Sequence, residues 1–69
     1  MREFNGNIIK VLRKENGETQ DDLAALIGTS APLVSQWETG ARVPSTPMLR
    51  NIADHYRVSM DSFFKEGNA

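Results

Sequence analysis

The side chains of this sequence that could do chemistry are few and scattered. The single histidine, His55, has no cysteine to join it in a metal site, because the chain contains none. The serines and aspartates fall among expected helix caps, and none is spaced as a nucleophile beside a general base. We therefore expect no enzyme, metal site or cofactor, and interpret His55 as a favourable cation near the C-terminal end of a helix.

The length and charge of the chain narrow its function further. Its 69 residues allow one small domain, 1–69, and its formal net charge is −1. A nucleic-acid-binding domain usually carries excess Lys and Arg, so any such function must rest on where the charges lie. No apolar run approaches the length of a membrane span, and the N-terminus lacks the apolar core of a signal peptide. We therefore expect a cytoplasmic protein with no membrane partner.

Apolar residues recur every three to four positions along most of the chain, which predicts helices and no strand. Five helices are expected, over residues 5–16, about 20–27, about 31–39, 46 to about 55, and 60–64. Leu23, Leu26 and Ile27 are expected to form the inner face of the second helix. The tail, residues 65–69, is expected to be frayed.

The second and third expected helices are separated by a very short turn. Only Thr29 lies between Gly28, which ends the second helix, and Ser30, the expected N-cap of the third. Two short helices joined by so tight a turn form a helix-turn-helix. In the third helix Val34 and Trp37 share the side that faces the core. The opposite side carries small or amide side chains, namely Ala31, Pro32, Ser35 and Gln36.

Several motifs occur in a fixed order between about residue 9 and residue 64. After an LRK in the first helix come TQxxLAxxIGTS, VSQWExG, RxPS and LxxIAxxYxVSMDSFF. Together they resemble the Cro/repressor-type helix-turn-helix family (lambda-repressor-like, xenobiotic-response-element), the domain of phage repressors and many bacterial regulators. The resemblance implies an all-α, compact five-helix bundle that binds operator DNA, usually as a symmetric dimer. Two recognition helices would then lie about 34 Å apart on an inverted repeat.

The resemblance assigns base contacts to the outer side of the third, recognition helix. Gln36 is expected to read an adenine through N6 and N7, and Ser35 either permits close approach or is a spacer. Ala31 and Pro32 cannot hydrogen-bond through their side chains, although family members often carry Arg, Gln or Asn at these positions. We expect these two residues to contact thymine methyl groups or, alternatively, only to start the helix.

Phosphate contacts are implied on both sides of the recognition helix. Gln20 is expected to meet a phosphate at the N-terminus of the second helix, or else to be a surface residue of a capped first turn. After the recognition helix, Thr39 and Gly40 are expected to offer N–H groups, and Ser45 its hydroxyl. Arg42 is expected either to bind a phosphate or to remain a solvated charge.

Two positions carry structural expectations. Arg13 flanks the apolar side of the first helix and Glu38 shares the inward side of the third, so each needs an opposite charge. In the family the matching positions form a partly buried salt bridge, which we expect here. Arg57 stands where the family commonly has Gly or Asn in a left-handed turn, so mild strain or an altered turn should follow.

The function implied is a sequence-specific transcriptional regulator of double-stranded DNA, a repressor acting as a homodimer on an inverted-repeat operator. Met60, Phe63 and Phe64 are candidates for the dimer contact or, equally, for the core of one chain. The alternative is a protein-interaction module, such as the antitoxin of a toxin–antitoxin pair or a regulator whose C-terminal part is missing. An exposed apolar patch at Phe63 and Phe64 would favour such a protein partner.

Overall fold

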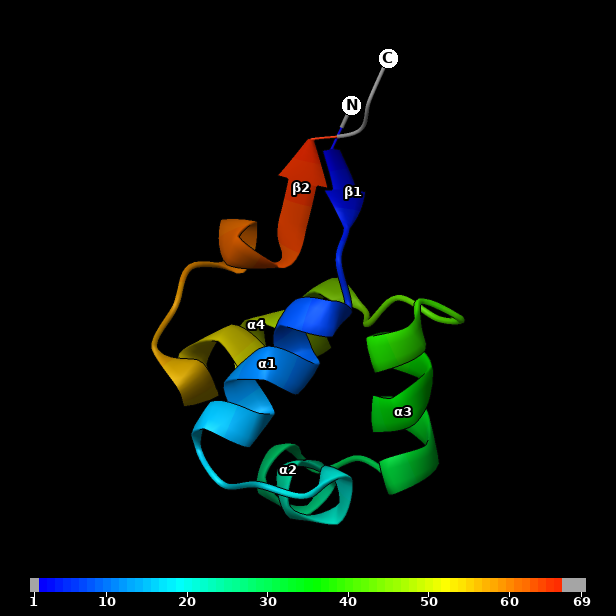
Figure 1. Cartoon of the computed structure of the whole chain (residues 1–69), viewed down its shortest axis with the longest axis vertical. Helices are drawn as coiled ribbons and strands as arrows, with labels where there is room; N and C mark the ends of the chain where they lie inside the picture. The colour runs from blue at the N-terminus through cyan, green and yellow to red at the C-terminus, as the bar shows by residue number, and fades with distance from the viewer. Residues whose placement is uncertain (1, 67–69) are drawn as a thin grey trace.

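The computed structural model describes residues 2–66 as a helical domain with a small terminal ribbon (Figure 1). Its helices are α1 (Asn7–Glu15), α2 (Gln20–Ile27), α3 (Ala31–Thr39), α4 (Thr46–Tyr56) and the short 3₁₀-helix η1 (Met60–Phe63). Its strands are β1 (Arg2–Phe4) and β2 (Phe64–Glu66). The predicted helix-turn-helix fold is confirmed, but the count of five α-helices is wrong for this range, because the fifth segment is η1. None of the described helices is long and apolar enough to span a membrane.

Local signals in the sequence explain where the helices begin and end. At the start of α2 the Thr19 hydroxyl accepts from the Asp22 N–H at 3.0 Å, and the Asp22 carboxylate accepts from the Thr19 N–H at 2.9 Å. Gly28 ends α2 at φ 77°, and the chain turns at once into α3. Ser30 is the N-cap of α3 by its backbone alone, since its side chain makes no capping hydrogen bond. Arg57 ends α4 in the predicted left-handed turn at φ 58°.

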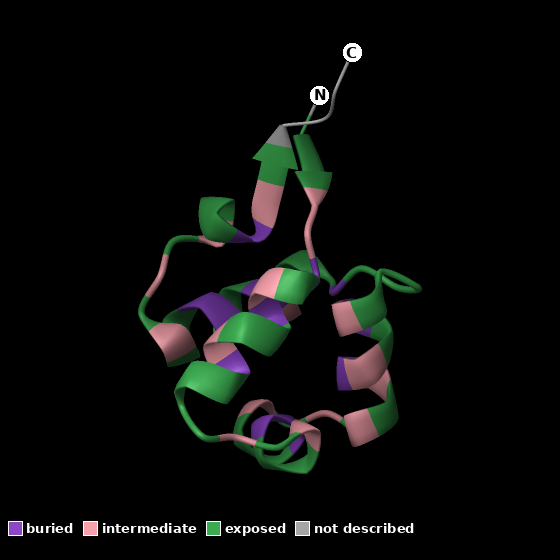
Figure 2. Ribbon diagram, in the orientation of Figure 1, coloured by how far each residue is buried: buried purple, intermediate pink, exposed green. Residues whose placement is uncertain are grey.

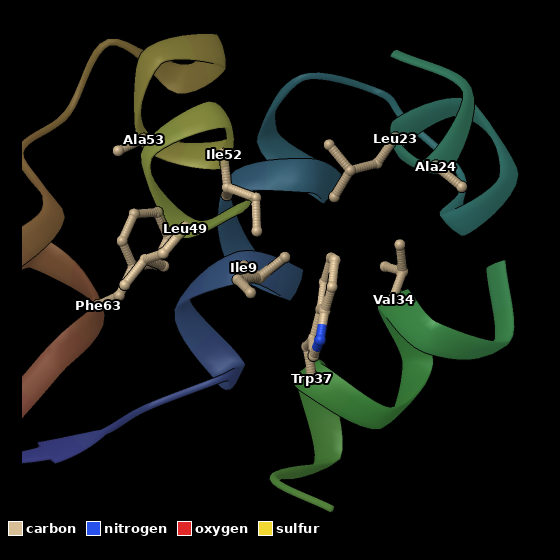
Figure 3. Close-up of a cluster of buried hydrophobic side chains, with 9 residues drawn as sticks. All are labelled: Ile9, Leu23, Ala24, Val34, Trp37, Leu49, Ile52, Ala53 and Phe63. Atoms are coloured by element: carbon tan, nitrogen blue, oxygen red, sulfur yellow. The ribbon is translucent and has the colours of Figure 1, made fainter. Parts of the chain in front are cut away.

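One core lies between the helices, and it draws on α1, α2, α3, α4 and η1. Its buried residues are Ile9, Leu23, Ala24, Val34, Trp37, Leu49, Ile52, Ala53 and Phe63. Figure 3 shows Trp37 pointing from α3 into the space between Ile9 and Val34. Leu26 was expected in this core, but it is 60% exposed and Ala24 is buried in its place. The packing of α2 against both α3 and α4 therefore selects the side that carries Leu23 and Ala24.

The two strands form an antiparallel ribbon that projects from the helices (Figure 1). Phe4 lies opposite Phe64 in the register, and the Asn5 N–H donates to the Phe63 carbonyl oxygen at 2.7 Å. Three-residue strands are too short to show alternation, and their partners lie about sixty residues apart in the chain. The expectation of no strand is therefore wrong at the two ends of the described range, because the periodicity of the sequence contains no signal for this pairing.

The expectation of a frayed tail is wrong where the structure describes that tail. Lys65 and Glu66 belong to β2, so both are paired with β1 rather than frayed. Residues 67–69 of the expected tail lie outside the described range.

Gly6 fixes how closely the start of α1 approaches the end of α3. It is the buried N-cap of α1, with an ordinary helical φ of −63°. A Cβ at this position would lie 1.7 Å from the carbonyl oxygen of Trp37. That oxygen belongs to the backbone and cannot move aside as a flexible side chain would. Gly6 is therefore required by the contact between the two helices, not by its own torsion angles.

The substitution Gly6→Ala should destabilise the domain by about 3 kcal/mol or more, because α1 and α3 must separate to admit the methyl group. Urea unfolding followed by circular dichroism measures this. Gly17→Ala is the matched control, since its added Cβ would meet nothing within 4 Å and only its left-handed φ of 67° is strained. We expect about 1 kcal/mol for the control. An equal or greater loss for Gly17→Ala would contradict the close approach.

Candidate nucleic-acid interface

The outer side of α3 presents the four residues that the sequence singled out. The inner side is fixed by Val34 and Trp37, which are 0% and 2% exposed. Figure 2 shows buried segments of α3 on the side toward the other helices and exposed segments on the other side. Pro32 and Gln36 are consequently exposed to solvent, while Ala31 and Ser35 are half-buried. Helical spacing places all four on the side away from the core, where their small size allows a flat or grooved partner to approach closely.

At the C-terminal end of α3, the Gly40 N–H and the Thr39 hydroxyl already donate hydrogen bonds within the protein. The Gly40 N–H donates to the Trp37 carbonyl oxygen at 3.2 Å as the helix ends with φ 84°. The Thr39 hydroxyl donates to the Gln36 carbonyl oxygen, also at 3.2 Å. The Gly40 N–H expected to meet a phosphate is thus already paired with the helix end, because a C-cap must satisfy the last carbonyl groups.

The loop after α3 leaves a cation and a hydroxyl beside the recognition helix. Arg42 is exposed, and its backbone N–H donates to the Gln36 carbonyl oxygen at 3.2 Å, which holds the loop against α3. The Ser45 hydroxyl oxygen accepts from the Met48 N–H at 3.3 Å and caps α4, so its own O–H can still donate outward. Next to them opens a pocket lined by Leu33, Trp37, Arg42, Val43, Pro44, Ser45 and Met48.

The structure brings Arg13 and Glu38 together as a buried ion pair. The Arg13 Nε lies 2.8 Å from Glu38 Oε2, and its Nη2 donates to Oε1 at 3.2 Å. The two side chains are 8% and 4% exposed. The hydrogen bonds with Glu38 raise the pKa of the Arg13 guanidinium, against the opposing effect of desolvation. This bidentate pair fastens α1 to α3 from the side opposite the exposed face.

Gln20 has a partner that the sequence did not suggest. Its Nε2 donates to Glu38 Oε1 at 3.1 Å, so the first residue of α2 is tied to the end of α3. From the sequence, Gln20 was expected either to meet a phosphate at the start of α2 or to be a surface residue of its capped first turn. Eighteen residues separate it from Glu38, and no local pattern reveals such a contact.

Glu18 was also missed, although it joins the ion pair to α4. Its backbone carbonyl oxygen accepts from Arg13 Nη1 at 2.6 Å. Its carboxylate accepts from the Tyr56 hydroxyl at 2.6 Å and lies 2.6 Å from His55 Nε2. His55, interpreted from the sequence only as a cation at a helix end, therefore has a specific acidic partner. Burial, and then the bond to Glu18, raise the pKa of Tyr56 well above its usual range.

The three candidates for a dimer contact occupy different environments. Phe63 is completely buried and belongs to the core of the single chain. Met60 and Phe64 are half-buried at the base of the ribbon. The Phe64 ring packs edge-on against Phe4, with 6.0 Å between the ring centroids, and the Arg2 guanidinium lies 5.5 Å from the centre of the Phe64 ring. Phe63 is therefore a core residue of the single chain, which was the alternative to a dimer contact.

This geometry is that of a helix-turn-helix domain. A family model described as Helix-turn-helix matches residues 9–63, most of the chain. The chain belongs to this family, the lambda-repressor/Cro type of helix-turn-helix. The family consists of DNA-binding transcriptional regulators and is not a family of enzymes.

Individual proteins that are similar to this chain in sequence or structure are consistent with the helix-turn-helix family. The uncharacterized HTH-type transcriptional regulator YazB of Bacillus subtilis (strain 168) is 34% identical over 56 residues, which are 81% of each chain. The P22 c2 repressor, solved in complex with a synthetic operator, is similar with a TM-score of 0.82 and 26% identity, over 88% of this chain and 92% of that one. Bacillus thuringiensis PlcR, solved with the peptide PapR7 and DNA, has a TM-score of 0.75 and 34% identity. That match covers 84% of this chain but 20% of PlcR.

The substitution Arg13→Ala should lower the free energy of unfolding by about 3–5 kcal/mol, because Glu38 would remain buried without its cation. Thermal and urea unfolding measure the loss. Lys10→Ala is the matched control on α1, since Lys10 is exposed, and it should change stability by less than about 0.5 kcal/mol. Wild-type unfolding for Arg13→Ala together with weakened DNA binding would instead make Arg13 a phosphate ligand.

The substitution Tyr56→Phe should cost about 1–2 kcal/mol at pH 7, the value of a partly exposed hydrogen bond to a carboxylate. The folded state holds the Tyr56 proton to higher pH than the unfolded chain, because the pKa is raised. This contribution is therefore complete below the ordinary tyrosine pKa of about 10 and is lost as pH rises above it. Urea unfolding of both proteins between pH 7 and 11 should show their difference shrinking. A constant difference would contradict the raised pKa.

Proposed function

We propose that the protein is a repressor that binds an inverted-repeat operator in double-stranded DNA as a homodimer, in the cytoplasm. The observation that carries the proposal is the outer side of α3, where exposed Pro32 and Gln36 stand opposite fully packed Val34 and Trp37. A helix held in this way can enter the major groove without losing its anchorage to the core. The operator-bound P22 c2 repressor supports the assignment, since it shares this fold and 26% of its sequence.

Base reading is assigned to one amide residue and three small residues. Gln36 donates to and accepts from an adenine edge through its carboxamide. Ser35 permits close approach or donates its hydroxyl, while Ala31 and Pro32 contact thymine methyl groups. The half-site is therefore read largely by shape and apolar contact, with Gln36 as the principal hydrogen-bonding reader.

Phosphate contacts are assigned to the two flanks of α3. Arg42 and the Ser45 hydroxyl serve the C-terminal flank, and Gln20 serves the N-terminus of α2. Thr39 joins them if its hydroxyl turns away from the Gln36 carbonyl oxygen. Gly40 contributes the left-handed end of the helix, which directs the loop toward the DNA. With one cation in this set, the domain should depend only weakly on salt when it binds.

The dimer contact is assigned to Met60 and Phe64 at the base of the ribbon. Both retain exposed surface, whereas Phe63 does not. Two copies related by a twofold axis would then present their α3 helices about 34 Å apart, one turn of B-DNA. A protein-interaction module would be favoured by a patch that included exposed Phe63, and Phe63 is completely buried.

Selection of bound duplexes from a randomised DNA pool at moderate salt, followed by sequencing, tests the proposed function. We expect an enriched inverted repeat whose half-site centres lie about one helical turn apart. Enrichment of a single half-site would remove the dimer. No enrichment at all would remove sequence-specific binding.

The same selection with Gln36→Ala should lose the preference at one position of each half-site. Affinity for the wild-type repeat should fall by about 1–3 kcal/mol, because one bidentate base contact is removed. Asn51→Ala on α4 is the matched control, an exposed amide outside the assigned contacts, and it should select the same repeat. An unchanged repeat with Gln36→Ala would assign base reading to other residues.

A further inference from the structure

We propose that Gln20 is a positioning residue between the buried ion pair and DNA: Glu38 holds one N–H of its carboxamide, and this directs the second N–H to a phosphate. The inference rests on the proposed function, which supplies the phosphate. It gives the Arg13–Glu38 pair a role in DNA contact as well as in folding, although neither charge touches DNA.

The orientation of the Gln20 amide follows from the chemistry of Glu38. An ionised carboxylate only accepts hydrogen bonds, so the NH₂ group of Gln20 and not its carbonyl oxygen must face Glu38. The Glu38 side chain is 4% exposed and takes all its donors from Arg13 and Gln20. Since Arg13 fixes the carboxylate through both of its oxygens, Glu38 in turn holds the Gln20 nitrogen at 3.1 Å. An NH₂ group has a second N–H, and this one remains to be donated.

The surroundings of Gln20 explain why a fixed neutral donor matters there. Gln20 is half-buried and opens α2, where the first N–H groups have no acceptor within the helix. The carboxylates of Asp21 and Asp22 follow it directly and would repel a phosphate. Asp22 is occupied by the Thr19 N–H, which lowers the pKa of Asp22 and keeps it charged. A mobile amide in this setting could present its carbonyl oxygen to the phosphate, whereas one held by Glu38 presents an N–H.

A test of this coupling removes Gln20 in two backgrounds. In the wild type, Gln20→Ala should weaken operator binding about tenfold or more, the value of one hydrogen bond to a charged group. The background Arg13→Met with Glu38→Leu replaces the ion pair by apolar residues, a change that folds in comparable systems. There Gln20→Ala should produce no further loss. The same fold-change in both backgrounds would overturn the positioning role.

The salt dependence of binding separates Gln20 from a charged ligand. Gln20→Ala should leave the slope of log affinity against log salt unchanged, because a neutral amide releases no counterion. Arg42→Ala is the matched control and should reduce that slope by about one. A reduced slope for Gln20→Ala would mean that the substitution disturbs other phosphate contacts, which overturns a role confined to one amide.

Side-chain amide NMR of the ¹⁵N-labelled wild type keeps the inference testable if the apolar background does not fold. The Gln20 carboxamide should show a contact to Glu38 in the free protein, and its second proton should shift when the operator is added. The exposed Gln36 carboxamide should show no protein contact in the free state. A Gln20 amide as free as that of Gln36 would overturn the inference without affecting the proposed function. Failure of the wild type to bind any duplex would remove the proposed function and the phosphate contact together, while the bond to Glu38 would still be measured.

Discussion

The fold depends on one buried guanidinium. Arg13 donates to the Glu38 carboxylate and to the Glu18 carbonyl oxygen, so it joins α1 to α3 and to the turn before α2. Gln20 donates to the same Glu38 carboxylate, and Tyr56 donates to the carboxylate of Glu18. All four α-helices are thereby linked by one continuous set of hydrogen bonds. In a 69-residue chain without cysteine, this network and a small core hold the helices together without disulfide bonds.

This hydrogen-bond network contributes more to the relative placement of the helices than to the net free energy of folding. Burying an ion pair costs desolvation energy that its attraction roughly repays, whereas breaking it leaves an unpaired buried charge. Its bonds are directional, so they set the angle at which α3 leaves the turn after α2. The contact of Gly6 with the Trp37 carbonyl oxygen acts at the same, C-terminal end of α3, one residue before Glu38. The recognition helix is thus held at its C-terminal end by a close backbone contact and along its length by Val34, Trp37 and Glu38.

The protein has a slightly negative net charge although its family binds DNA, and the positions of its donors and charges explain how both can hold. A net charge of −1 gives little general attraction to a polyanion, so binding must come from placed donors and shape. The exposed side of α3 offers small side chains and a single amide, and Arg42 lies on its flank. Of the acidic residues at the start of α2, Asp22 forms the capping box with Thr19, which ties it to the fold. Affinity for DNA would then depend on close fit more than on the number of cations.

The sequence by itself determined every feature that is encoded locally. Caps and glycines such as Thr19, Gly28 and Gly40 marked the helices to within a few residues, and helical spacing assigned Val34 and Trp37 to the core. The pairing of Arg13 with Glu38 was accessible because two charges lay on apolar sides and the family resemblance joined them. Contacts between distant residues left no such local mark. The ribbon, the exposure of Leu26, the partners of Gln20 and Glu18 and the close approach at Gly6 were decided by tertiary structure alone, because each depends on how two elements are brought together in space.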